Sequence, residues 1–198
     1  TQRNLVAVKV FSAPLIANSP SAKAALVREM EVLKKLNHPH IVRCYGGLLE
    51  ESYGCIAWEL IDGESLAALL SRPGRLAWES VVEFSAQLSK ALEHAHEAGL
   101  VHQDLTPEKI LVAPNDQLKI ADFRCDRATN AACASSQRKT LDRAKYLSPE
   151  QLRGETKLTP QSDLYMLGCI MYHMLVGKPP YEGQTIEELT QQRQNSRP

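Results

Sequence analysis

The chain lacks the features that mark several common protein classes. Its longest apolar run, residues 164–177, is too short to span a bilayer, and no secretory signal pattern opens the sequence. The five cysteines are scattered and form no C-x-x-C pair, which argues against a disulfide framework and against a zinc finger. We therefore expect a cytoplasmic protein that makes no membrane contact in this segment.

An excess of charge of one sign is also missing. The 198 residues carry 23 basic and 23 acidic side chains, so a nucleic-acid coat or a polybasic membrane anchor is not expected. The sequence opens directly into a strand pattern and does not begin with methionine. We expect a fragment of a longer protein, with no nucleic-acid partner.

The first pattern in the chain is a strand over residues 5–11. β-branched and aromatic residues alternate there with a period of two, so that Lys9 shares a face with Leu5, Ala7 and Phe11. A lysine on an otherwise apolar face is costly to bury unless it has a partner of opposite charge.

A helix follows, with clear signals at both ends. Ser19 is a candidate N-cap, Pro20 occupies the first helical position, and Pro39 lies beyond the end. Glu29 falls on the apolar stripe of this helix, whose other members are Ala22, Leu26, Leu33 and Leu36. On the residues alone, Lys9 and Glu29 are explained by a structural ion pair.

The rest of the chain changes from strands to helices near Leu60–Glu64, which suggests two halves. The expected elements are strands in residues 40–50 and 53–61, helices over 76–98 and 160–176, a hairpin over 101–123, and a polar loop from 124 to about 144. Asp104 and Asp122 stand on either side of the hairpin, with Lys109 between them, so two carboxylates remote in sequence should be close in space.

Several motifs together resemble the protein kinases. "VAVK", a helix with an inward glutamate, "LNHPHIV", "HQDLTPEKILV", "DF", "SPE" and "SDLYMLG" come in the order and approximate spacing of that fold. The similarity is closest to serine/threonine kinases, and the last two motifs resemble bacterial receptor-type members. It implies an α+β, two-lobed kinase-like fold that is partial at both ends, because no G-x-G-x-x-G precedes "VAVK". Residues 1–61 would form a partial N-lobe ending in the hinge, and residues 62–198 a partial C-lobe.

The resemblance implies a role for each carboxylate. Asp104 matches the aspartate that orients the substrate hydroxyl, and Asp122 matches the aspartate that holds magnesium across the ATP phosphates. Lys9 would hold the α- and β-phosphates, and Glu29 would hold Lys9 in place.

The adenine site is implied in the same way. Ala7 and Leu111 would sandwich the ring, and residues from Glu59 to Ile61 would form the hinge that binds its edge. Trp58 matches the residue that guards the pocket behind adenine, and its bulk should leave little space there. Without the motif register, the apolar members of this set would be explained as ordinary core residues.

Lys109 departs from the family pattern, because it replaces an asparagine that binds a second magnesium ion. An ammonium group has no lone pair for a metal. One magnesium site is expected and the second is doubtful. Lys109 could place its own charge near the phosphates, or it could pair with Asp104 or Asp122 and close the site.

Other departures surround the catalytic loop. Thr106 stands for a lysine that contacts the transferred phosphate, and Arg143 stands for a threonine bonded to that lysine. Arg143 would reach back to the phosphate or Asp104 and restore a cation; the alternative is a solvated loop arginine. Gln103 replaces an arginine that often binds a phosphorylated activation loop, and Arg124 replaces a glycine.

Three functions compete on these residues. The first is an ATP-dependent serine/threonine protein kinase, whose partners are ATP, magnesium and a protein substrate. The second is a pseudokinase that acts as a nucleotide-responsive or scaffolding module. The third, an unrelated α/β binding domain, would require the registered motifs to be a coincidence. The sequence leaves the substrate and the oligomeric state open.

Overall fold

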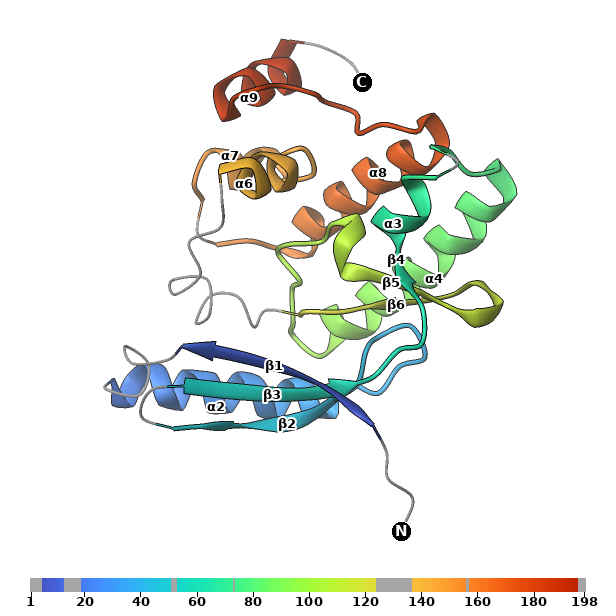
Figure 1. Ribbon diagram of the computed structural model, residues 1–198. Helices are drawn as coiled ribbons and strands as arrows, with labels where there is room; N and C mark the ends of the chain where they lie inside the picture. The colour runs from blue at the N-terminus through green and yellow to red at the C-terminus, as the bar shows by residue number, and fades with distance from the viewer. Residues whose placement is uncertain are drawn as a thin grey trace.

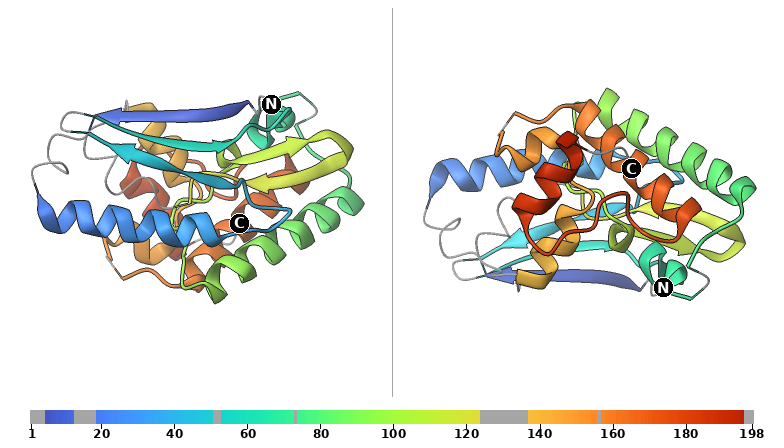
Figure 2. Two further views of the ribbon diagram at one scale, coloured as in Figure 1. Left: turned by 90° about the horizontal axis from the view of Figure 1, so that it is seen from below. Right: turned by 90° about the horizontal axis from the view of Figure 1, so that it is seen from above.

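Two small antiparallel sheets organise the chain in a computed structural model that describes residues 5–12, 19–50, 53–72, 74–123, 137–155 and 157–195 (Figure 1). The first sheet has the strand order β1-β3-β2 and the second has the order β4-β5-β6. Most of the helices lie with the second sheet, and α2 lies with the first (Figure 2). The strand-rich and helical halves expected from the sequence are therefore present.

The first sheet is built from β1 (Val6–Ser12), β2 (Cys44–Leu49) and β3 (Tyr53–Glu59). On β1, Ala7 and Lys9 are half-buried and Phe11 is buried, as the alternation predicts. The opposite face of β1 is exposed; its members are Val6, Val8 and Val10.

Helix α2 (Pro20–Lys35) runs alongside the first sheet (Figure 2). The Ser19 side chain accepts a hydrogen bond from the Ala22 N–H at 3.4 Å, and Pro20 begins the helix, so both N-terminal signals are confirmed. Leu26 and Leu33 are buried on the face that the apolar stripe predicted. The helix therefore covers the sheet with the face that also carries Glu29.

The second sheet contains the predicted hairpin, β5 (Ile110–Ala113) and β6 (Gln117–Ile120), with the two-residue strand β4 (Glu64–Ser65) on its edge. The turn η2 (Pro114–Asp116) has Asn115 and Asp116 at positive φ, 62° and 57°. Short polar side chains tolerate that conformation, which explains why this turn reverses the chain.

The helices α3 (Leu66–Leu70), α4 (Trp78–Glu97) and α8 (Pro160–Val176) form the larger core. Thr159 caps α8 in a capping box, and Gly177 ends it at φ 87°, both as the sequence predicts. The core residues contributed by α4 and α8 are Leu88, Ala91, Leu92, Ala95, Met166, Ile170 and Met174. In the described part of the chain, no helix is long and apolar enough to cross a membrane.

Residues 38–43 join the two sheets directly. Ile41 forms a parallel bridge with Ile120, and the Val42 N–H donates to the Ile120 carbonyl at 2.9 Å. The Ile120 N–H in turn donates to the His40 carbonyl at 2.9 Å. The strand expected from residue 40 thus begins only at Cys44, because residues 40–42 bond to β6 instead of to the first sheet.

The expected loop to about residue 144 is partly wrong. Residues Gln137–Ala144 form helix α6, which has a single apolar branched side chain, Leu141, and so shows no stripe in the sequence. Two further helices follow, α7 (Pro149–Leu152) and α9 (Ile186–Asn195), and α9 packs against both α6 and α7 (Figure 1). Arg124 lies outside the described residues.

Candidate active site

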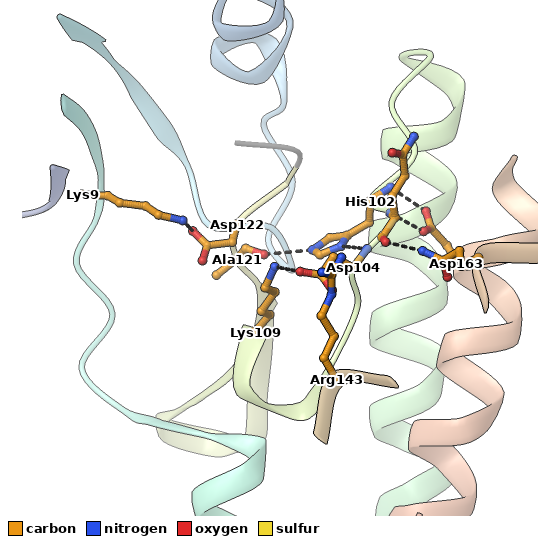
Figure 3. Close-up of polar contacts among 10 residues, drawn as sticks. Lys9, His102, Asp104, Lys109, Ala121, Asp122, Arg143 and Asp163 are labelled. Atoms are coloured by element: carbon orange, nitrogen blue, oxygen red, sulfur yellow. Dashed lines mark hydrogen bonds and ion pairs between the residues drawn. The ribbon is translucent and has the colours of Figure 1, made fainter. Parts of the chain in front are cut away.

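A buried carboxylate fixes the loop that carries Asp104. Asp163, on the first turn of α8, is fully buried and accepts hydrogen bonds from the backbone N–H groups of His102 and Gln103 at 2.7 and 2.8 Å (Figure 3). The His96 Nε2 atom lies 2.8 Å from the same carboxylate. Three polar groups therefore compensate the burial of Asp163, and the loop backbone is held to α8.

His102 supports Asp104 from the other side. The Asp104 N–H donates to His102 Nδ1 at 3.2 Å, so Nδ1 is unprotonated and Nε2 must carry the proton. Nε2 lies 3.0 Å from the Ala121 carbonyl and donates to it (Figure 3). Burial lowers the pKa of His102, which keeps this neutral form. His102 thus links the catalytic loop to the residue before Asp122, a structural role.

Two residues of the site have left-handed backbone. Gln103 has φ 67° and Asp122 has φ 60°, values that cost free energy for side chains other than glycine. The Gln103 carbonyl accepts a hydrogen bond from Gln151 Nε2 at 2.6 Å, so both polar groups of its backbone are held. The surrounding bonds keep the loop in this shape.

Asp104 is bonded to two cations. Lys109 Nζ contacts its Oδ2 atom, and Arg143 Nε contacts its Oδ1 atom (Figure 3). The Asp104 side chain is 10% exposed, while that of Lys109 is 16% and that of Arg143 is 42% exposed. Arg143 therefore reaches back from α6 to Asp104, and the description of a solvated loop arginine does not fit.

Asp122 faces the first sheet. Lys9 Nζ lies 3.3 Å from Asp122 Oδ1, and each side chain is 33% exposed (Figure 3). Glu29 is half-buried on α2. Its pairing with Lys9 stays a prediction.

The residues expected around adenine come from both sheets and from the segment that follows β3. Ala7 is paired with Trp58 across β1 and β3, and Trp58 is 7% exposed. Leu111 and Ile61 are both partly buried hydrophobic residues at the edge of the core. Trp58 is buried, and its place behind the adenine ring stays a prediction.

Glu59 is tied to the second sheet by its side chain. Glu59 Oε2 accepts hydrogen bonds from Lys119 Nζ at 3.0 Å and from the Arg43 N–H at 3.2 Å. The Glu59 backbone N–H also donates to the Arg43 carbonyl at 2.9 Å, so Glu59 is bonded to residue 43 through both its side chain and its backbone.

The donor set fits one magnesium ion bound together with phosphates. Among the described residues, no three His, Cys, Asp or Glu side chains gather into a metal cluster. Magnesium in phosphoryl-transfer sites takes one or two carboxylates and relies on phosphate and water for its remaining ligands. Asp122 supplies such a carboxylate. Lys109 supplies no lone pair for a metal ion. Thr106, which precedes it on the loop, is buried, with 5% of its surface exposed.

Sequence reasoning missed His96, Gln151 and Arg193. His96, near the end of α4, bonds to the Asp163 carboxylate. Gln151 donates through Nε2 to the Gln103 carbonyl and accepts through Oε1 from the Ser148 N–H of the α7 capping box. Arg193 donates to backbone carbonyls after α6. His96 continues the helical spacing of Leu88 and Leu92, and Gln151 stands in the S-x-x-Q spacing of a capping box; Arg193 shows no such signal.

Comparison with known families matches residues 1–197 to the protein kinase domain. The chain belongs to the protein kinase family, as its motifs, its two sheets and the placement of Lys9, Asp104 and Asp122 predicted.

Its relatives include bacterial serine/threonine kinases. The chain is 36% identical over 186 residues to a probable serine/threonine-protein kinase, SCO3848, of Streptomyces coelicolor, covering 91% of this chain and 27% of the relative. It is 38% identical over 187 residues to serine/threonine-protein kinase PknB of Mycolicibacterium smegmatis, covering 91% and 29%. For PknA of Mycobacterium tuberculosis the values are 37% over 183 residues, 90% and 42%. The chain thus spans less than half the length of these relatives.

Proposed function

We propose that this domain transfers the γ-phosphate of ATP to serine or threonine hydroxyls of a protein. The observation that supports the proposal best is that Lys9 pairs with Asp122 and that Asp104 lies beside this pair (Figure 3). Asp104 is fixed on a loop held by Asp163. Phosphoryl transfer needs positioning and charge neutralisation rather than a covalent nucleophile, and this set supplies both.

Each of the three side chains has a separate task in the proposal. Lys9 binds the α- and β-phosphates, Asp104 accepts the hydrogen bond of the acceptor hydroxyl, and Asp122 is the residue that would hold magnesium. Bound magnesium would neutralise phosphate charge. Ala7 and Leu111 enclose the adenine ring, and the hinge backbone at Glu59 and Ile61 binds its edge.

The two cations on Asp104 replace charges that the family takes from elsewhere. A γ-phosphate beside Asp104 carries more negative charge than a carboxylate, so it would draw Lys109 and Arg143 toward itself. Asp104 would then be free to accept from the acceptor hydroxyl. In this proposal Lys109 compensates for the second metal ion, and Arg143 compensates for the lysine that Thr106 replaces.

The pseudokinase alternative draws on the same contact. With both oxygens of Asp104 bonded to cations, the carboxylate has less capacity for a substrate hydroxyl. The relatives, which are named as kinases, favour transfer over this alternative.

The deciding experiment measures transfer of labelled γ-phosphate by the full-length protein, onto itself and onto a generic basic protein, with magnesium and with manganese. Asp104→Asn should reduce transfer by about 1000-fold, because the amide is a poor acceptor for the hydroxyl proton. The control is Asp62→Asn, which changes an exposed carboxylate after the hinge. A folded wild-type protein that binds ATP and transfers no phosphate would refute the kinase proposal.

A further inference from the structure

We propose that Arg193, on α9, is a positioning residue: it holds the backbone after Arg143 so that the Arg143 side chain reaches Asp104. The role in transfer rests on the proposed function, whereas the positioning itself is a property of the folded chain. The two can therefore fail separately.

Arg193 is bonded to the two residues that follow Arg143. Its Nη2 atom donates to the Ala144 carbonyl at 2.9 Å and to the Lys145 carbonyl at 2.8 Å. The Tyr146 N–H donates back to the Arg143 carbonyl at 3.1 Å and closes the turn. One guanidinium nitrogen of α9 thus holds the two carbonyls that follow Arg143, and the Tyr146 N–H holds the Arg143 carbonyl itself.

An arginine near a helix end usually places its guanidinium in water. The Arg193 guanidinium is instead held partly away from water. Its Cζ atom lies 5.0 Å from the centre of the Tyr181 ring. Its Nε and Nη1 atoms are buried, and the guanidinium lies near Tyr165 and Cys169 of α8. A guanidinium placed among these groups is held by tertiary contacts of α9 and is not simply a solvated helix arginine.

A second contact fixes the other side of the same turn. The Tyr146 hydroxyl lies 2.7 Å from His173 Nδ1 on α8, and the two rings stack. Burial lowers the pKa of His173 and raises that of Tyr146, so the neutral hydroxyl donates to the neutral ring. The turn over residues 143–146 is therefore anchored on α8 at one end and on α9 near its centre.

Such anchoring matters because Arg143 has a long and half-exposed side chain. Fixing the rotamers of an arginine costs conformational entropy, and the cost rises when its backbone also moves. With residues 144 and 145 held in place, the Arg143 side chain starts from one backbone position. Its partner Asp104 is 39 residues away in the chain. The contacts thus run from α9 through the turn to Asp104.

Hydrogen–deuterium exchange of the full-length protein tests the positioning without any enzyme activity. Arg193→Gln should raise exchange about tenfold in a peptide covering residues 141–148 and leave the α4 peptide unchanged. Arg193→Lys should retain most of the protection, because its ammonium group can still donate to the carbonyls. The control is Arg153→Gln, an arginine paired with Glu155 at the surface beside α7.

A double-mutant cycle tests whether Arg193 acts through Arg143. Arg193→Gln should lower kcat about tenfold with KM for ATP unchanged, since misplacement near the phosphate slows the chemical step. In an Arg143→Thr background the same change should cost less than about twofold, which is the non-additivity expected of two residues acting as a unit.

The outcomes separate the two proposals. Unchanged exchange over residues 141–148, or equal losses of kcat in both backgrounds, would overturn the positioning role of Arg193. Raised exchange in α4 as well would also overturn it, since the effect would then be global. A wild-type protein that transfers no phosphate would refute the kinase proposal alone, and the exchange result would still decide whether Arg193 positions the turn.

Discussion

Lys109 and Asp104 are five residues apart and bonded side chain to side chain, so the ammonium group of one lies on the carboxylate that would orient the acceptor. Lys109→Asn should exchange this charge for a metal ligand. We expect transfer below the wild-type rate at limiting magnesium and at or above it in excess magnesium. The measurement is rate against free magnesium at saturating ATP. A variant that stays slow at every magnesium concentration would show that the ammonium itself is required.

Arg143→Thr should lower kcat by about 100-fold, because it removes a cation from the place where charge develops in transfer. Adding Thr106→Lys should recover much of the loss by restoring the family arrangement of cation and hydroxyl. Single-turnover assays of the two single variants and the double variant test this exchange. If Arg143→Thr or Arg143→Lys transfers phosphate at the wild-type rate, the proposed compensation is wrong.

Trp58→Ala should destabilise the protein by about 3–5 kcal/mol, because the indole is buried and its removal leaves a cavity. Urea unfolding measures the change. Trp78→Ala is the matched control, since that side chain is 65% exposed and its loss should alter stability by less than about 0.5 kcal/mol.

The same Trp58→Ala variant should admit ATP analogues that carry a bulky group on the adenine amine, which the wild type should exclude. Binding of one such analogue to both proteins checks the assignment. Equal binding would show that Trp58 does not border the adenine site.

Stability should fall as pH is lowered below about 6.5. Burial lowers the pKa of His38, His102 and His173 below the ordinary value of 6.5, so the unfolded chain takes up protons first. The free energy of unfolding then decreases with falling pH until the folded histidines also protonate.

Urea unfolding from pH 7.5 to 5 measures this loss, and His38→Gln should reduce its slope. His38 stacks on His94 with ring centres 5.2 Å apart, and His40, Lys90 and Lys119 add repulsion to its protonated form. A slope unaffected by the substitution would assign the loss to other groups.

Much of the fold could be predicted from local signals. The ends of α2 and α8 follow from Ser19, Pro20, Thr159 and Gly177, because caps act through bonds to nearby backbone groups. Helix α6 could not be predicted, since no apolar stripe distinguishes it. Its position depends on α9 and on the Arg143 contact with Asp104, which are remote in the sequence.

The site divides in the same way. The motif register was enough to place Asp104, Asp122 and Lys9, and the suggested reach of Arg143 to Asp104 is present in the structure. The sequence positions of His96, Gln151 and Arg193 do not show which groups these side chains bond to. Their partners are backbone groups and a carboxylate brought near by tertiary packing, and a single sequence does not show which side chains meet there.

The strand-rich half is attached to the helical half on two sides. One side has the covalent hinge near Ile61 and the Glu59 bond to Lys119, and the other has the hydrogen-bonded line from His40 to Val42 along Ile120. A body attached along two lines can rock about the axis that joins them, but it resists sliding and twisting. Rotation about this axis should therefore change the distance between Lys9 Nζ and Asp122 Oδ1, while Lys9 shifts little sideways relative to Asp104.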